Sequence, residues 1–478
     1  MLKILNFING NHCEAVNKNF IENSNPSTGL VYSTLPDSDE QDVERAIESA
    51  QNAYNSWSNI SAESRFKILN RIAELIDEKN EELALAESID QGMPLWFART
   101  QVTLSAQNFR FFATAAMQYS STNHSMEGNY VNYNQKSPIG IVACISSWNL
   151  PLYIITWKIA PALATGNCVI AKPSEFAPAT AFMLSEICYQ AGLPNGVLNI
   201  INGRGEKAGN IIVSHPKIKA ISFTGKLSTG KVISTLAAPL FKKLSLELGG
   251  KNPVLIFADC NLEKAVKETV RASFLNQGEL CRSGSRILVE EKIYNNFKKA
   301  FLTELKYQSL GNPLLNDTKI GAIVSKQHYD KILSYIEIAK AEGGKILFGG
   351  EPVFPKGLEN GWFISPTVIE NLKNESICNR EEIFGPVVTL TSFKTEVDAL
   401  EIANSTDYGL ASSVWTENIQ TAHRIATNIK TGLVWINCWM YVDTKSPFGG
   451  MKNSGNGNSG AWNIMDFFTE QKNVYIKY

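Results

Sequence analysis

Apolar positions recur at helical spacing through most of the first 120 residues. The segment from Asp42 to Trp57 places its apolar side chains on one helical face: Val43, Ala46, Ile47, Ala50, Ala53, Tyr54 and Trp57. The same periodicity predicts a helix over 61–87, with Ser61 as its N-cap, and another over 95–119. Gly92-Met-Pro94 separates these two helices. We therefore expect a mostly helical N-terminal region.

After Pro138 the pattern changes to short apolar runs that alternate with helical stretches. Predicted strands are 139–145, 168–171, 197–201, 218–223 and 243–246, and predicted helices are 152–164, 178–191, 207–214 and 228–240. This alternation predicts a doubly wound parallel sheet. It restarts at Pro253 with a strand over 254–257 and a helix over 263–275, which indicates a second α/β domain. The polar and aromatic stretch 120–136 fits neither pattern, and we expect it to form a projecting hairpin.

Composition excludes several classes of protein. The chain has 478 residues, 44% hydrophobic and 19% charged, which is typical of globular proteins and argues against disorder, collagen or coiled coil. Its net charge of -1 provides no long-range attraction to nucleic acid or anionic lipid. The apolar runs are too short to cross a bilayer, and we recognise no secretory signal.

The eight cysteines form no C-x-x-C pair and the five histidines are scattered, so we expect neither a metal site nor a disulfide framework. A reduced, cytoplasmic protein is the simplest interpretation.

Two glycine-rich turns each follow a predicted strand and open a predicted helix. They are Gly203-Arg-Gly205-Glu-Lys-Ala-Gly209 and Gly225-Lys-Leu-Ser-Thr-Gly230. Glycines at such a position let backbone N–H groups approach a pyrophosphate at a helix N-terminus. Neither turn has the G-x-G-x-x-G spacing, so ordinary turn chemistry remains the alternative.

Three further segments carry reactive side chains. Lys172-Pro-Ser-Glu175 follows a strand, where a Lys and a Glu could bind ribose hydroxyls, although a solvated loop is the plainer interpretation. Glu247 follows another strand, and Cys281 ends the segment Gln277-Gly-Glu-Leu-Cys281. Such a carboxylate and thiol could form a base and nucleophile pair. A single Cys is more often a small buried apolar residue, but the polar, Gly-rich setting of Cys281 favours exposure.

Taken together, these segments resemble the NAD(P)-dependent aldehyde dehydrogenase superfamily over essentially the whole chain. The resemblance rests on Ser147-Trp-Asn-Leu-Pro151, Lys172-Pro-Ser-Glu175, Phe223-Thr-Gly225, Leu246-Glu-Leu-Gly-Gly-Lys251, Gln277-Gly-Glu-Leu-Cys281, Glu382-Ile-Phe-Gly-Pro386 and Pro447-Phe-Gly-Gly-Met-Lys452. It implies that Cys281 attacks the aldehyde and forms a thiohemiacetal and then a thioester. Asn149 and the Cys281 N–H would stabilise the oxyanion, and Glu247 would activate the hydrolytic water.

The resemblance also implies a set of cofactor contacts. Lys172 and Glu175 match the pair at the adenosine ribose, while Glu382, with Phe384 beside it, matches the ligand of the nicotinamide ribose. The other expected contacts are Ser147, Trp148, Ser174, Gly205, Phe223, Thr224, Gly225, Lys226, Gly230 and Leu248. A carboxylate at Glu175 should repel a 2′-phosphate and favour NAD. Lys226 stands where the family usually has a small residue and could meet the pyrophosphate or a 2′-phosphate, so NADP stays open.

The implied architecture is α/β: a Rossmann-like cofactor domain, a second α/β catalytic domain and a small β oligomerisation arm. We expect the NAD-binding domain at 1–119 and 138–248, the catalytic domain at 249–446, and the arm at 120–137 and 467–478. A homodimer or homotetramer is the expected assembly, with a small-molecule aldehyde as substrate.

Within the superfamily, the chain looks most similar to the 2-aminomuconate and 2-hydroxymuconate semialdehyde dehydrogenases. This similarity lies in Gln107-Asn-Phe-Arg-Phe-Phe-Ala113, Asn149-Leu-Pro-Leu-Tyr153, Thr156-Trp-Lys158, Lys242-Lys-Leu-Ser-Leu246 and Trp435-Ile-Asn-Cys-Trp439. It implies that Arg110 clamps the substrate carboxylate, whereas a surface Arg is the alternative. Asn458 stands where that group has a second Arg, and 441–445 also differs, so a less acidic aldehyde stays open.

Two other functions compete with aldehyde oxidation to a carboxylate. A coenzyme A-acylating dehydrogenase would cleave the thioester with a thiol, but such enzymes generally lack the base that Glu247 provides. A binding protein on a retired enzyme scaffold would usually have lost its nucleophile, whereas Cys281, Glu247 and Asn149 are all present.

Overall fold

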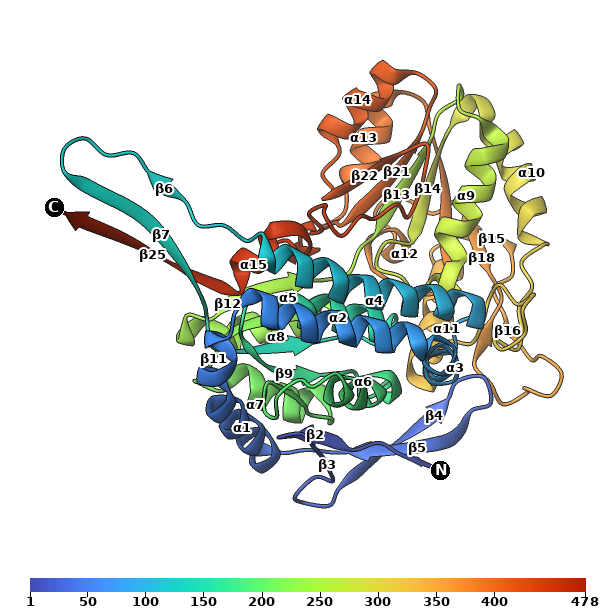
Figure 1. Cartoon of the computed structure of the whole chain (residues 1–478). Coiled ribbons are helices and arrows are strands. Elements are labelled where there is room, and N and C mark those ends of the chain that lie inside the picture. The colour runs from blue at the N-terminus through green and yellow to red at the C-terminus, as the bar shows by residue number, and fades with distance from the viewer.

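The computed structural model describes the backbone of residues 1–478 and every side chain except that of Ala461. Two α/β sheets form the body of the molecule, and a narrow β-ribbon projects from one side (Figure 1). A Rossmann-like sheet, a second α/β sheet and a small β arm are the architecture that the motifs predict.

The first sheet has eight strands in the order β24-β12-β11-β8-β9-β10-β2-β3. Their bounds are β24 Gly455–Asn456, β12 Lys243–Glu247, β11 Ile218–Thr224, β8 Ile141–Ile145, β9 Cys168–Lys172, β10 Leu198–Ile200, β2 Asn6–Ile8 and β3 Asn11–Cys13. The five central strands are parallel, and β24 and β2 pair antiparallel at the two ends of that parallel run. The chain runs outward from β8 through β9 and β10 and then crosses back to β11. The topological switch point, where open α/β sheets bind ligands, therefore lies between β8 and β11.

The second sheet has seven strands in the order β15-β18-β19-β14-β13-β21-β22. Their bounds are β15 Lys345–Phe348, β18 Thr367–Glu370, β19 Val387–Phe393, β14 Gly284–Glu290, β13 Asn252–Ile256, β21 Ala411–Trp415 and β22 Leu433–Ile436. Only β15 is antiparallel to its neighbour. This sheet is the second α/β unit that the renewed alternation after Pro253 predicts.

The helices are α1 Glu40–Asn59, α2 Ala62–Glu78, α3 Asn80–Gln91, α4 Leu95–Met117, α5 Pro151–Ala164, α6 Ala179–Gln190, α7 Asn210–Ser214, α8 Leu227–Ala237, α9 Leu262–Phe274, α10 Tyr294–Leu305, α11 Lys326–Ala341, α12 Ile377–Arg380, α13 Glu396–Asn404, α14 Ile419–Asn428 and α15 Ala461–Phe467. Ser61 is the N-cap of α2, as predicted, and its side chain accepts from the Ser64 N–H. The single helix predicted over 61–87 is wrong in one respect, because the chain breaks at Lys79 and restarts as α3. None of the helices described is long and apolar enough to span a bilayer.

The N-terminal 36 residues form strands, where the sequence predicts mostly helix. Besides β2 and β3, they contain β1 Leu2–Lys3, β4 Phe20–Asn25 and β5 Leu30–Pro36, which make a separate three-stranded sheet. These strands are short and largely exposed, so they lack the apolar alternation by which a strand is recognised. Four shorter strands pair elsewhere: β16 Pro352–Val353 with β17 Phe363–Ile364, and β20 Tyr408–Gly409 with β23 Met451–Lys452.

The projecting segment predicted over 120–136 is a β-ribbon, β6 Asn123–His124 and β7 Tyr130–Pro138. The C-terminal strand β25, Thr469–Lys477, pairs antiparallel with β7 along its whole length (Figure 1). Tyr130, Tyr475 and Ile476 are exposed on this ribbon. The domain boundaries inferred from the family resemblance remain a prediction.

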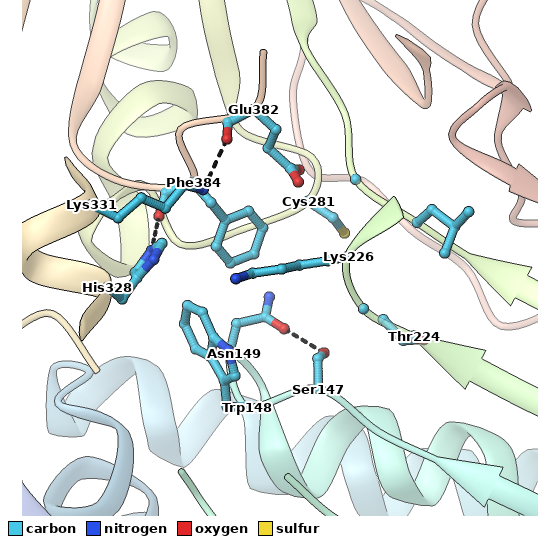
Figure 2. Close-up of a pocket in the computed structure, with 13 residues that line it drawn as sticks. Ser147, Trp148, Asn149, Thr224, Lys226, Cys281, His328, Lys331, Glu382 and Phe384 are labelled. Atoms are coloured by element: carbon cyan, nitrogen blue, oxygen red, sulfur yellow. Dashed lines mark hydrogen bonds between the residues drawn. The ribbon is translucent and has the colours of Figure 1, made fainter. Parts of the chain in front are cut away.

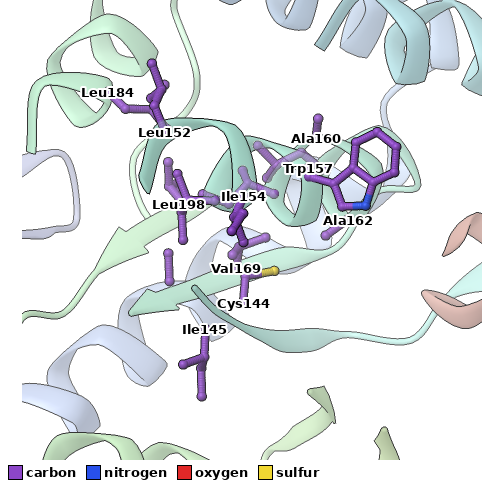
Figure 3. Close-up of a cluster of buried hydrophobic side chains, with 14 of the residues drawn as sticks. Cys144, Ile145, Leu152, Ile154, Trp157, Ala160, Ala162, Val169, Leu184 and Leu198 are labelled. Atoms are coloured by element: carbon purple, nitrogen blue, oxygen red, sulfur yellow. The ribbon is translucent and has the colours of Figure 1, made fainter. Parts of the chain in front are cut away.

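The core of the first sheet is built around α5, which is buried at every residue except Tyr153. In Figure 3, Ile154 of this helix lies toward Val169 of β9 and Cys144 of β8, and Leu152 lies beside Leu184 of α6. Trp157 packs edge to face with Phe112 of α4. A helix that is buried on nearly every side needs cover on both faces, and α4 packs on the side of α5 away from the sheet. The start of α5 is therefore held rigidly, directly after the loop that leaves β8.

One buried carboxylate ties down this helix start. Glu87 of α3 is fully buried, and its Oε1 accepts from the Leu152 N–H at 2.9 Å and from Thr180 Oγ1 at 2.6 Å. The first N–H groups of a helix have no partner within the helix, so Glu87 satisfies one of them. Burial raises the pKa of Glu87 to about 7.

We predict that Glu87 makes the stability of the protein depend on pH. A carboxyl whose pKa is raised by folding stabilises the folded protein below its unfolded pKa, and this advantage is lost as pH rises through about 7. Relative to Glu87→Gln, the native protein should lose about 3 kcal/mol of stability between pH 4.5 and 7.5, since each pKa unit is worth about 1.4 kcal/mol. Thermal unfolding of both proteins across this range measures the difference. The matched control is Glu48→Gln, at an exposed position of α1, which should track the native protein at every pH.

Candidate functional site

A crevice opens at the carboxyl ends of β8, β11 and β12, at the switch point of the first sheet, and faces the second sheet (Figure 2). It is lined by Ser147, Trp148, Asn149, Thr224, Gly225, Lys226, Leu248, Gly249, Cys281, His328, Lys331, Glu382 and Phe384. Segments far apart in the chain thus meet where the strand order predicts a ligand site. The sequence motifs do not single out Gly249, His328 and Lys331, which the fold adds.

The loop after β8 fixes the amide of Asn149. Its Oδ1 accepts from Ser147 Oγ at 2.8 Å, and its Nδ2 donates to the Glu279 carbonyl at 3.0 Å. The Asn149 side chain is nearly inaccessible to solvent, so the amide orientation is set by these two contacts. One Nδ2 hydrogen remains to donate to a group bound in the crevice.

Cys281 is presented by a turn with unusual backbone geometry. Asn276, Gln277 and Gly278 all have positive φ, at 52°, 56° and 71°. Gln277 is held by the Gly321 N–H, which donates to its Oε1 at 3.1 Å, and by the Ala322 carbonyl, which accepts from its Nε2 at 3.1 Å. Strained turns of this kind persist only where surrounding contacts hold them, and they cluster at functional sites.

The thiol of Cys281 is neutral in this environment. Its pKa is raised to about 11, mainly by burial; the positive charge of Arg282 opposes this shift, and the charges of Glu247 and Glu382 add to it. Only the thiolate is a strong nucleophile, so a reaction at neutral pH needs a base that removes the proton.

Glu247, the last residue of β12, has a carboxylate oxygen available for that purpose. Its Oε2 accepts from Thr224 Oγ1 at 2.8 Å and lies 3.9 Å from Lys158 Nζ. Its Oε1 is buried and has no hydrogen-bond partner among the described atoms. Glu247 does not itself line the crevice, but its charge acts on the Cys281 thiol. An unsatisfied buried carboxylate oxygen of this kind can accept a proton from a thiol or from a water molecule that reaches it.

The opposite wall is formed by the loop that carries Glu382 and Phe384. Phe384 has a positive φ of 62°, and its carbonyl lies 2.6 Å from His328 Nε2. Lys331 donates to the Glu382 carbonyl at 3.0 Å, and Trp148 meets the Phe384 ring edge to face at 5.3 Å. Burial lowers the pKa of His328 to about 3, so this His is neutral and serves as a hydrogen-bonding partner of the loop.

A second cluster gathers Lys172, Ser174, Glu175 and Gly205 beyond β9. Lys172 lies 3.6 Å from Glu175, and the Gly205 N–H donates to Glu175 Oε1 at 3.4 Å. Gly205 opens a π-helical turn, Gly205–Gly209, that leads into α7. The structure thus brings together the residues expected at an adenosine ribose.

Two other expected cofactor residues act as supports. Phe223 is buried, and its ring packs directly against Gly225. A Cβ at position 225 would come within 2.5 Å of that ring. Gly230 lets α8 approach Leu248 closely, because a Cβ at position 230 would lie only 2.7 Å from Leu248 Cδ2. Both glycines are required by close packing.

The crevice fits a nicotinamide dinucleotide in chemistry as well as in place. Lys226, at the N-cap of α8, extends across the crevice near Phe384 and has no ion-pair or hydrogen-bond partner among the described residues (Figure 2). A free cation at a helix N-terminus suits a pyrophosphate. The Glu382 carboxylate can accept from ribose hydroxyls when its contact to the Gly250 N–H, 2.8 Å, is exchanged.

A larger cavity of about 740 Å³ adjoins the site. It is lined by Phe97, Thr100, Gln101, Leu104, Gln107, Asn108, Tyr153, Arg271, Leu275, Arg282, Met440, Tyr441, Val442, Asp443, Thr444 and Ser446. Cys281 lines the crevice while Arg282, the next residue, lines the cavity, so this turn contributes one side chain to each space.

The structure does not bring Arg110 to either space. Its guanidinium forms an ion pair with Asp77 of α2, and 40% of its side-chain area is exposed. Gln107 of the same helix lines the cavity and Arg110 does not, so the predicted carboxylate contact of Arg110 stays a prediction. Asn458 is exposed and does not line the cavity either.

Comparison with known proteins agrees with this geometry. The model of the aldehyde dehydrogenase family matches residues 13–474. A 2-aminomuconic semialdehyde dehydrogenase of Homo sapiens is 45% identical over 100% of this chain and 99% of its own. A putative aldehyde dehydrogenase from Burkholderia cenocepacia has a TM-score of 0.98 at 37% identity, covering 100% of this chain and 98% of that one.

A betaine aldehyde dehydrogenase from Staphylococcus aureus, solved in complex with NAD+, has a TM-score of 0.97 at 37% identity over 99% of this chain and 94% of that one. The family match, the full-length relatives and the crevice built around Cys281 lead to one assignment: this chain belongs to the aldehyde dehydrogenase family and is an NAD(P)-dependent oxidoreductase.

Proposed function

We propose that this protein oxidises a semialdehyde of the muconic type to the corresponding dicarboxylate, with NAD as hydride acceptor. The observation that carries the proposal is that Cys281 lines a crevice of dinucleotide chemistry while the next residue, Arg282, lines a 740 Å³ cavity that can hold an aldehyde. The 45% identity to a 2-aminomuconic semialdehyde dehydrogenase supports the choice of substrate class.

In the proposed reaction, Cys281 loses its proton to Glu247 and its sulfur attacks the aldehyde carbon. The oxygen of the resulting thiohemiacetal accepts from Asn149 Nδ2 and from the Cys281 N–H. The nicotinamide, when bound, accepts the hydride that leaves this carbon, and a thioester on Cys281 remains. Glu247 releases the proton from the thiol to solvent and can then act as a base a second time. It takes a proton from a water molecule whose oxygen attacks the thioester, and it passes this proton to the leaving sulfur, which restores the thiol. The acid product loses its own proton to solvent and leaves as the carboxylate.

The cluster around Glu175 supports NAD over NADP. Its carboxylate is already oriented by Lys172 and by the Gly205 N–H, and it would repel a 2′-phosphate at an adenosine ribose. Lys226 lines the crevice with Cys281 and Glu382, so we assign its cation to the pyrophosphate.

We also propose a homodimer or homotetramer assembled through the β-ribbon of β6, β7 and β25. The exposed Tyr130, Tyr475 and Ile476 supply apolar surface there. A cytoplasmic location remains our proposal for the compartment, and the cysteines of the described chain are all unpaired.

Two other functions fit less well. Coenzyme A acylation would cleave the thioester with a thiol, so it would not need the water-activating base that the unpaired oxygen of Glu247 can provide. A less acidic aldehyde is the nearer alternative, because Asn458 and the stretch 441–445 depart from the muconic subgroup, and the substrate test below separates the two.

The proposed reaction predicts NADH formation, measured at 340 nm, when the protein is given NAD and a muconic-type semialdehyde. Cys281→Ala should abolish this signal and leave NAD binding intact, because the thiol alone is removed. An aldehyde panel run with NAD and NADP identifies the preferred pair. Equal kcat/KM for acidic and neutral aldehydes would contradict the substrate class, and residual turnover by Cys281→Ala would exclude the thiol as nucleophile.

Glu247→Gln should separate acylation from hydrolysis. Without the base, deacylation is expected to slow by about 10²–10⁴-fold. Stopped-flow measurement should then show a burst that approaches one NADH per active site, followed by a slow steady state. Steady turnover at the native rate would remove Glu247 from the hydrolytic step.

Lys226→Ser tests the cofactor contact. Loss of a charge-assisted contact to the pyrophosphate should raise KM for NAD and for NADP together, by about tenfold. Initial rates with each cofactor measure this. Selective loss of NADP activity would instead put Lys226 at the 2′-phosphate, and unchanged KM values would leave it a solvated helix-start residue.

A further inference from the structure

Arg282 is a buried cation that the protein itself leaves unpaired. Only 6% of the residue is exposed, and its Nε is buried with no acceptor among the described atoms. No described carboxylate lies within ion-pair distance of its guanidinium, whose nearest notable contact is the Phe448 ring at 5.5 Å. Buried charges are normally paired, so this exception calls for a partner from outside the chain.

Arg286, four residues further along the same chain, shows how this fold treats an arginine with a structural task. It is also buried, and its three guanidinium nitrogens donate to the carbonyls of Lys251, Ile402 and Ala403 at 3.0, 2.8 and 2.7 Å. Arg282 has none of these contacts, and only its backbone carbonyl is engaged, by Trp439 Nε1 at 3.2 Å. Packing alone therefore does not account for the guanidinium of Arg282.

The space that Arg282 faces is the 740 Å³ cavity beside the reactive thiol. We propose that the Arg282 guanidinium binds the carboxylate of the substrate and so selects aldehydes that carry an anionic group. This inference rests on the proposed aldehyde oxidation and names the group that recognises the far end of its substrate. A guanidinium holds a carboxylate through two parallel hydrogen bonds, which fixes orientation as well as charge.

The other charged groups of the cavity leave this role to Arg282. Arg271 also lines the cavity, but it is exposed and pairs with Glu268 at 3.0 Å. Asp443 lies at the rim, exposed to solvent and 3.9 Å from Lys445 Nζ, where water screens its charge. Arg282 is thus the one cation of this cavity that is both buried and unpaired among the described residues.

The position of Arg282 also limits the shape of the substrate. Consecutive Cα atoms are about 3.8 Å apart, so the thiol and the guanidinium start from nearly the same point of the chain. The long Arg side chain carries its charge into the cavity while the thiol points into the crevice. The aldehyde that fits has its carboxylate separated from the reacting carbon by a short carbon chain.

The test compares a short-chain semialdehyde acid with its methyl ester, which has the same length and no charge. For Arg282→Gln, the ratio of kcat/KM for the acid over the ester should fall by roughly 10- to 100-fold. Arg282→Lys keeps the positive charge but loses the two-point geometry, so its ratio should lie between those of the native protein and Arg282→Gln. Arg99→Ala, which removes a surface guanidinium paired with Glu81, is the matched control and should leave the ratio unchanged.

A second readout does not depend on turnover. The inhibition constant of glutarate, which carries carboxylates but no aldehyde, should rise in Arg282→Gln by a similar factor. Equal losses for the acid and the ester, or unchanged glutarate inhibition, would overturn the assignment.

Arg282 could instead act on the thiol of Cys281. In that case the pH dependence of Cys281 alkylation by iodoacetamide should shift to higher pH in Arg282→Gln while the acid-to-ester ratio stays unchanged, and this result also rejects the proposal. If the native protein oxidises neither aldehyde, the proposed aldehyde oxidation is itself wrong. If it oxidises both and Arg282→Gln leaves the acid-to-ester ratio unaltered, only the proposed role of Arg282 is refuted.

Discussion

The site depends on how the turn before Cys281 is held. Three consecutive residues with positive φ cost free energy, of order 1–3 kcal/mol for each non-glycine residue. The surrounding structure offsets this cost with buried hydrogen bonds. Asn276 Nδ2 donates to the Asn149 carbonyl at 3.0 Å, so the turn is tied directly to the residue whose amide faces the crevice. A shift of the turn would therefore move the thiol and its oxyanion donor together, and their relative geometry is preserved.

Glu279 extends the same constraint to the rest of the molecule. This fully buried carboxylate accepts from Gln91 Nε2 at 2.7 Å and from the Val324 N–H at 3.2 Å. Its pKa is raised well above the ordinary value by burial. Through the Glu279 carboxylate, the end of α3 and the loop before α11 are both hydrogen-bonded to the turn between α9 and β14. The segment that presents the nucleophile is thus anchored to the first and the second α/β units at once.

The sequence predicts well wherever local pattern and buried position coincide. The strands and helices from β8 to β13 are recognised because each buries a continuous or periodic apolar face. Ten of the crevice residues are recognised because they lie in the motifs shared with the aldehyde dehydrogenases, several of which follow strand ends. His328 and Lys331 are missed because they sit on α11 and reach the crevice only through tertiary packing. The role of Arg110 stays a prediction, because a helical arginine between aromatic residues looks the same in sequence whether it faces a cavity or, as in this structure, pairs with Asp77.

Arg282 illustrates the converse limit. In the sequence it is merely a charge beside a candidate nucleophile, and nothing local indicates whether water or a carboxylate surrounds it. The proposed role of Arg282 is inferred from its burial, from the absence of an acceptor for its Nε and from the cavity that it lines. Since Cys281 and Arg282 are neighbours in one rigid turn, the reacting atom and the proposed recognition group cannot drift apart. Placing both on that turn makes the positioning of an acidic aldehyde a property of the backbone, so the binding energy of the carboxylate goes into orienting the carbonyl at the thiol.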